Sequence, residues 1–97
     1  MIKYWEQITA DAIALRHALH RIPELNGLEV QTSEQIRAAL SAAGISWRAC
    51  AKTGTAVVLA RNASGRHIAL RADIDGLPIM EKSGVAWSSE TPGCMHA

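Results

Sequence analysis

The sequence lacks the features that mark two large classes of protein. Its ten basic and nine acidic residues leave a net charge of +1, and the basic residues are scattered along the chain. Nucleic-acid binding needs a clustered basic surface, so we expect no nucleic-acid partner. The longest nearly apolar stretch, Thr55 to Ala60, is far shorter than the roughly 20 residues of a membrane-spanning helix. We therefore expect no membrane insertion.

Cysteine is scarce as well. The chain of 97 residues has two, Cys50 and Cys94, which could in principle pair. The N-terminal residues Met1 to Gln7 lack the apolar run of a secretory signal peptide. These absences together indicate a cytoplasmic protein, in which reduced thiols are the default. Internal repeats and low-complexity tracts are also missing, and the length suits one small domain.

What the chain does contain begins with a helical pattern. Apolar residues recur every three or four positions, the spacing that lines one face of an α-helix. They are Trp5, Ile8, Ala12, Leu15 and Leu19. Pro23 should end this helix by Arg21 or Ile22, because the residue before a proline is pushed out of the α region. Residues 24–27 then read as a turn.

A second helix is predicted over residues 29–43. Thr32 and Gln35 fit a capping box, which would place the start at Thr32. Val30 continues the apolar face and favours an earlier start, near Leu28, so both starts stay open. Gly44 suits the helix end, because glycine readily takes the left-handed conformation there.

The second half of the chain predicts strands. Residues 45–50 alternate, residues 55–60 form a short apolar run typical of a strand covered on both faces, and residues 67–73 read as a third strand. The short link between the last two predicts an antiparallel hairpin. From Gly76 onward the pattern is irregular. The sequence thus indicates an α/β protein with the order α-α-β-β-β followed by a loop.

The predicted elements do not make a finished domain. The strand at 55–60 needs apolar cover on both faces, but two helices cover only one face of a three-stranded sheet well. The irregular segment after Gly76 is longer than a compact domain usually tolerates. A chain this short buries a limited fraction of its surface, so an uncovered sheet face would weaken it. We expect a fragment.

Histidine and cysteine supply the candidate metal ligands, but their spacing is not decisive. His17 and His20 are close enough on a helix to share one face, although their charged neighbours favour a solvated position. His67 reads as a polar residue at a strand edge. Cys94 and His96 have the spacing of a ligand pair, yet a flexible tail is the simpler interpretation.

Two carboxylates stand at the end of the third predicted strand. Asp73 and Asp75 are alternate residues, so they point to the same face of an extended segment. Catalytic groups of α/β enzymes often lie at such strand ends. Alternatively, these carboxylates cap the strand end or pair with Arg71 or Lys82. Spacing alone leaves both interpretations open.

Three segments resemble one family of enzymes. Residues 15–25, 70–79 and 93–97 are similar to the signature segments of the hippurate hydrolase-like amidohydrolases, within the aminoacylase and carboxypeptidase group of metallohydrolases. The second segment matches Leu-Arg-Ala-Asp-x-Asp-Ala-Leu-Pro, with Gly76 in place of alanine. The third matches the start of Gly-x-Met-His-Ala-Cys-Gly-His-Asp.

The resemblance implies a fold and a metal. Residues 1–97 would be the N-terminal fragment of an α/β/α zinc-peptidase-like catalytic domain, without the second domain that relatives use for association. The cofactor would be a divalent ion, zinc or manganese, whose first ligands would come after Ala97, so none lies in this chain. Asp75 would orient a ligand of that ion. The resemblance assigns no role to His20 or His96.

The resemblance also implies a reaction. Full-length relatives would hydrolyse an N-acyl amino acid to a carboxylic acid and an amino acid, with the ion polarising the amide carbonyl and a carboxylate taking the proton of the attacking water. A homodimer is expected only of the full-length form. The fragment alone should be inactive. Two alternatives remain, a small α/β interaction module and one half of a split hydrolase.

Overall fold

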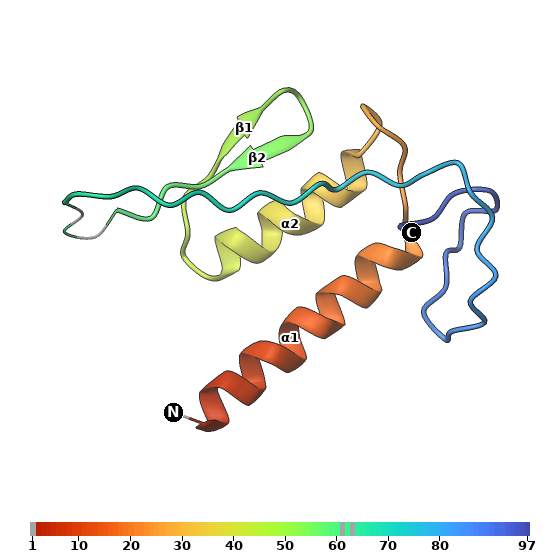
Figure 1. Cartoon of the computed structure of the whole chain (residues 1–97), viewed down its shortest axis with the longest axis horizontal. Coiled ribbons are helices and arrows are strands. Elements are labelled where there is room, and N and C mark those ends of the chain that lie inside the picture. Colours follow the sequence, from red (N-terminus) through yellow and green to blue (C-terminus); the bar gives the residue numbers. More distant parts are fainter. Residues whose placement is uncertain (1, 61, 63) are drawn as a thin grey trace.

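Two helices, one short hairpin and a long irregular segment make up the molecule. Figure 1 shows this arrangement in a computed structural model that describes residues 2–60, 62 and 64–97. In chain order the elements are α1 (Ile2–Arg21), α2 (Val30–Ala42), β1 (Arg48–Cys50) and β2 (Gly54–Ala56).

Helix α1 ends where the sequence predicts, at Arg21 before the buried Pro23. Only part of its apolar face is buried. Leu15 and Leu19, in the C-terminal half, are half-buried, whereas Trp5 is 61% exposed in the N-terminal half. The periodicity therefore predicted the helix correctly, but most of its N-terminal half has no cover among the described residues.

Helix α2 begins at Val30, so the predicted capping box is wrong. The Thr32 hydroxyl does not cap its own helix but donates to Glu24 Oε1 at 2.7 Å. The same carboxylate accepts the backbone amides of Thr32 at 2.7 Å and of Gln31 at 3.1 Å. A carboxylate from the preceding turn thus satisfies amides of the first helical turn, where the helix dipole favours negative charge.

The end of α2 follows the prediction. Gly44 has φ +72° and the Ile45 amide donates to the Leu40 carbonyl at 2.9 Å, as in a Schellman motif. Arg37, on the last turns of α2, then ties the helix to the hairpin. Its guanidinium donates to Thr55 Oγ1 and to the Gly54 carbonyl, each at 2.9 Å.

The hairpin joins the first and second predicted strands, not the second and third. Strands β1 and β2 pair antiparallel, with Arg48 opposite Ala56 and Cys50 opposite Gly54. The predicted hairpin of residues 55–60 with residues 67–73 is wrong, because residues 57–60 and 67–73 belong to no strand. The turn between β1 and β2 is tight because Ala51 and Lys52 both adopt positive φ, 51° and 69°.

The third predicted strand is not formed. Within residues 57–60, 62 and 64–75, the described part of that region, no residue belongs to a strand. The chain is extended there (Figure 1), but no neighbouring segment pairs with it. A strand needs a partner to accept and donate its backbone hydrogen bonds, so the local β pattern of residues 67–73 is not sufficient.

The segment after Gly76 is irregular, as predicted, and it is held in place by the body of the molecule. The Gly76 amide donates to the Glu24 carbonyl at 2.7 Å, and Gly76 forms a parallel bridge with Leu25. Leu77 and Met95 exchange backbone hydrogen bonds at 2.8 and 3.0 Å. Among the described residues, neither helix has the length and apolar character needed to cross a membrane.

Candidate functional site

A cavity of about 800 Å³ lies where α1, α2, residues 72–77 and the last residues of the chain meet. Its wall is largely apolar, with side chains such as Leu19 and Ile36. Several polar or titratable groups also reach it, namely Arg16, His20, Asp73, Asp75 and His96. Apolar walls with a few convergent polar groups are typical of a small-molecule site.

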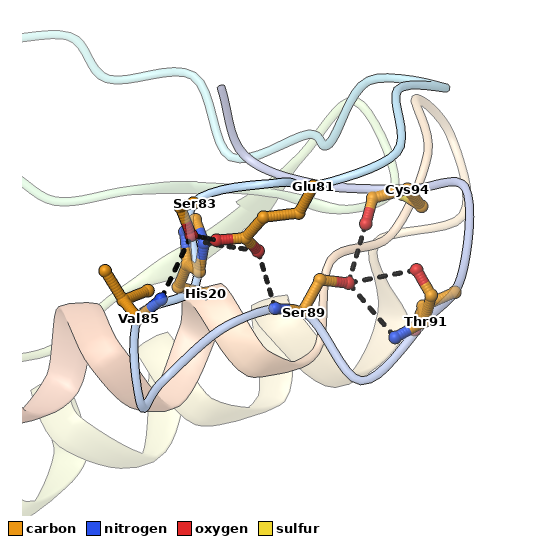
Figure 2. A network of polar contacts seen from close by, with 7 residues as sticks. All are labelled: His20, Glu81, Ser83, Val85, Ser89, Thr91 and Cys94. Atoms are coloured by element: carbon orange, nitrogen blue, oxygen red, sulfur yellow. Dashed lines mark hydrogen bonds and ion pairs between the residues drawn. The ribbon is translucent and has the colours of Figure 1, made fainter.

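His20 is fixed by a carboxylate from a distant part of the chain. Its Nε2 lies 3.0 and 3.1 Å from the two carboxylate oxygens of Glu81, and their side chains are only 14% and 7% exposed (Figure 2). The Ser83 hydroxyl also donates to Glu81, and the Ser89 amide donates to it at 2.6 Å. These contacts hold the His20 ring in one orientation.

The hydrogen bonds also set the charge of Glu81. The Ser83 hydroxyl bond, the Ser89 amide bond and His20 together outweigh the effect of burial and lower the pKa of Glu81 to about 2. The carboxylate is therefore ionised at neutral pH. Sequence reasoning missed Glu81, because a single glutamate in an irregular segment carries no periodic or motif signal.

His17 stacks on Trp87, with ring centroids 3.8 Å apart and planes inclined by 11°. Burial lowers the pKa of His17, and the neighbouring charges of Arg16 and Arg21 lower it further. The solvated position expected for His17 and His20 is therefore wrong for both rings. Each anchors the segment after residue 80 to α1, and they do not form a metal-binding pair.

The end of the chain is well packed, so its interpretation as a flexible tail is wrong. Cys94 is 6% exposed, and its carbonyl accepts a hydrogen bond from the Ser89 hydroxyl at 2.6 Å (Figure 2). His96 Nε2 lies 3.3 Å from the Ile74 carbonyl. The His96 ring is centred 6.0 Å from the ring of His20, so the two histidines lie together at the cavity.

The two aspartates have different surroundings. Asp73 accepts a hydrogen bond from Arg71 at 2.8 Å, and both side chains are largely exposed, at 71% and 88%. Pairing with Arg71 was one of the interpretations left open, and it is correct for Asp73. Asp75 is half-buried and lines the cavity with His20 and His96.

The remaining candidates do not gather into a metal centre. His67 is exposed and lies outside any strand. Cys50 is exposed, Cys94 is buried, and both thiols are free. Across the part of the chain that the structure describes, no group of three or more His, Cys, Asp or Glu side chains could hold a metal ion. The described residues therefore do not hold a divalent ion by themselves, and the resemblance places the ligands of that ion outside this chain.

Curated relatives match most of this chain, although no family model does. The N-acetyl-L-cysteine deacetylase of Bacillus subtilis (strain 168) is 45% identical over 86 residues, which are 88% of this chain and 21% of that protein. The N-acetyldiaminopimelate deacetylase of Streptococcus suis (strain 05ZYH33) is 43% identical over 91 residues, 90% of this chain and 24% of that protein. The chain thus spans less than a quarter of the length of these two relatives.

A solved structure agrees with the relatives. The crystal structure of a Bacillus subtilis protein, described as a dinuclear metal-binding peptidase from the M20 family, superposes with a TM-score of 0.85. The match is 35% identical and covers 94% of this chain and 26% of that one. The predicted fold class is thereby confirmed. By sequence and by fold, this chain is a homologue of the N-terminal part of the M20-family amidohydrolases.

Proposed function

We propose that this chain forms the N-terminal part of the catalytic domain of an amidohydrolase that cleaves N-acyl amino acids. Support comes from the relatives, which are named as deacetylases of N-acetylated amino acids. The observation that carries the proposal is the cavity, which collects His20, Asp75 and His96 from three separate segments. An apolar wall suits an acyl group or an amino-acid side chain.

Within this proposal Asp75 is a positioning residue. Its half-buried carboxylate faces the cavity and is able to accept a hydrogen bond from a ligand side chain of the active site. Such bonds fix the orientation of a ligand, and their loss typically lowers metal affinity or activity roughly 10- to 100-fold. Asp73 receives no such role, because it pairs with Arg71 at the surface.

The proposal also holds that these residues do not hydrolyse an amide by themselves. The described residues offer no cluster of ligands for a metal ion, so the zinc or manganese expected from the resemblance would need side chains from further polypeptide. The second domain for association that the resemblance implies would likewise lie in that polypeptide.

A chimera tests the proposal. Residues 1–97 would replace the matching segment of the Bacillus subtilis N-acetyl-L-cysteine deacetylase, and release of the free amine from N-acetyl-L-cysteine would be measured with added Mn²⁺ or Zn²⁺. We expect the chimera to hydrolyse the amide and the isolated chain not to. A folded chimera that binds metal but is inactive would contradict the proposal, as would hydrolysis by the isolated chain.

Two substitutions in the chimera test the role of Asp75. We expect Asp75→Asn to lower kcat, metal content or both by roughly 10- to 100-fold. Asp11→Asn removes a carboxylate from the exposed face of α1, away from the cavity, and should change kcat less than about twofold. Equal effects of the two substitutions would show that Asp75 has no positioning role.

A further inference from the structure

The His20 ring uses only one of its two nitrogens within the described part of the chain. Nε2 lies 3.0 and 3.1 Å from the two carboxylate oxygens of Glu81, whereas no hydrogen bond of the described residues involves Nδ1. Every buried side-chain nitrogen or oxygen of these residues has a hydrogen-bond partner. Nδ1 has none, so it is not buried, and the open space that His20 lines is the cavity.

The charge of Glu81 decides which nitrogen of His20 carries a proton. An ionised carboxylate can only accept hydrogen bonds, and Glu81 is ionised because hydrogen bonds from Ser83 and Ser89 lower its pKa to about 2. Nε2 therefore carries a proton and donates to Glu81. In the neutral ring the other nitrogen, Nδ1, then has a free lone pair. His20 thus offers the cavity a hydrogen-bond acceptor.

Further contacts fasten the segment that carries Glu81 to the end of α1. Besides the hydrogen bond with the imidazole ring, Trp87 stacks on His17 with ring centroids 3.8 Å apart. The Glu90 amide donates to the Arg21 carbonyl at 2.9 Å. The Glu81 side chain is only 7% exposed, so water competes little for its oxygens. The acceptor nitrogen is therefore held in place before any ligand arrives.

The donors at the cavity have partners other than Nδ1 of His20. His96 Nε2 lies 3.3 Å from the Ile74 carbonyl, which can only accept, so this nitrogen donates away from His20. The two imidazole rings are centred 6.0 Å apart and share no hydrogen bond among the described residues. The Arg16 guanidinium donates to His17 Nε2 at 3.1 Å. The lone pair of Nδ1 is therefore left for a ligand.

We propose that His20 Nδ1 accepts a hydrogen bond from the amide N–H of the substrate, and that Glu81 is the positioning residue that keeps this nitrogen unprotonated. The inference rests on the proposed function and adds a substrate class, secondary amides. The scissile amide of an N-acyl amino acid carries an N–H group, whereas the corresponding ester has none. A site built around a hydrogen bond rejects an analogue that lacks the donor, because the acceptor then loses its partner.

NMR on the isolated chain tests the position of the proton. Long-range ¹H–¹⁵N correlation spectra in alkaline buffer, where imidazole rings are neutral, distinguish the two tautomers of His20. We expect a proton on Nε2 and none on Nδ1 in the wild type. Glu81→Gln should show partial protonation of Nδ1, because the amide group of glutamine can donate to Nε2 as well as accept from it. A proton on Nδ1 in the wild type would overturn the inference without any measurement of activity.

A pair of substrates tests the hydrogen bond itself in the chimera described above. N-acetyl-L-alanine and O-acetyl-L-lactate differ only in an N–H group that oxygen replaces. We expect Glu81→Gln to lower kcat/KM at least about tenfold for the amide and less than about threefold for the ester. Glu90→Gln makes the same chemical change on an exposed side chain of the same segment, and it should change both values less than about twofold.

The outcomes separate this inference from the proposed function. An active chimera in which Glu81→Gln lowers kcat/KM equally for the amide and the ester refutes the role of His20 alone. An inactive chimera that is folded and binds metal refutes the proposed function alone. In that case the affinities of the metal-free chimera for the two compounds, measured by calorimetry, replace the rates. We then expect a preference for the amide that Glu81→Gln removes, and equal affinities in the wild-type chimera would overturn the inference.

Discussion

Gly76 and Cys94 pack against each other so closely that a Cβ atom added at Gly76 would lie 3.0 Å from Cys94 Sγ. The same Cβ would lie 3.0 Å from Pro23 Cβ. The family motif that resembles residues 70–79 has alanine where this chain has Gly76. The buried sulfur of Cys94 therefore lies where the methyl group of an alanine at position 76 would need space. This contact brings together three segments that are far apart in the sequence.

The first prediction concerns this contact. Gly76→Ala should lower the free energy of unfolding by about 1–2 kcal/mol, because overpacking costs more than the gain from a stiffer unfolded chain. In a chain that already carries Cys94→Ala, the same substitution should cost less, since the sulfur is gone. Urea unfolding of the two single variants and the double variant measures this coupling. Additive effects within about 0.5 kcal/mol would contradict a direct contact.

The second prediction concerns the pH dependence of Glu81. Its pKa is lowered from 4.5 to about 2, first by the Ser83 hydroxyl bond. A lowered carboxyl pKa means that its contribution to stability is complete above pH 4.5 and is lost as the pH falls from there through about 2. The Ser89 amide, which donates to Glu81, should report this protonation in an NMR titration with a midpoint near 2.

Glu81→Gln is the matched control for that titration. It keeps the size of the side chain but cannot ionise, so the acidic transition of the Ser89 amide should disappear. A local probe is needed because the pKa of Glu24 is also lowered, by its hydrogen bonds with Thr32 and Gln31 against the opposing effect of burial. A midpoint at or above 4.5 would show that the network around Glu81 does not form.

The third prediction concerns the start of α2. Glu24→Ala should lower the free energy of unfolding by about 1 kcal/mol, because amides of the first helical turn lose their acceptor. Glu24→Gln keeps one acceptor oxygen and loses the charge, so it should cost less. Far-ultraviolet circular dichroism during urea unfolding measures both effects. Equal stability of the wild type and the alanine variant would mean that the carboxylate contributes nothing to the helix.

The fourth prediction concerns the turn between β1 and β2. Ala51 has φ 51°, a conformation that costs an L-residue about 1 kcal/mol and costs glycine little. Ala51→Gly should therefore leave the stability unchanged or raise it by up to about 1 kcal/mol. Ala49→Gly, on strand β1, should instead lower it, because glycine weakens a strand interior. Relative to the wild type, the urea midpoint should stay unchanged or rise for Ala51→Gly and should fall for Ala49→Gly.

Some features of this protein follow from short stretches of its sequence. Pro23 and Gly44 end the two helices at the predicted places, because each residue acts on the backbone within one or two positions. The family resemblance also needed only three short segments, and the relatives confirm it. The α/β class could therefore be predicted from local patterns of residues alone.

Strand pairing could not be predicted in this way. Residues 67–73 have a β pattern, but a ladder forms only where another segment lies beside them, and the tight turn at Ala51 and Lys52 pairs residues 48–50 with 54–56. The capping box failed for a related reason. The acceptor for the first turn of α2 comes from Glu24, outside the local motif.

The sequence by itself determined the helices, the class of the fold and the family to which the chain is related, because these depend on local backbone preferences and on short motifs. Only the tertiary structure decided the candidate site. His20 and Glu81 are 61 positions apart, and His96 joins His20 only because residues 76–97 fold back against α1. Contacts of this range depend on where the chain turns in three dimensions, and no periodicity or spacing encodes them.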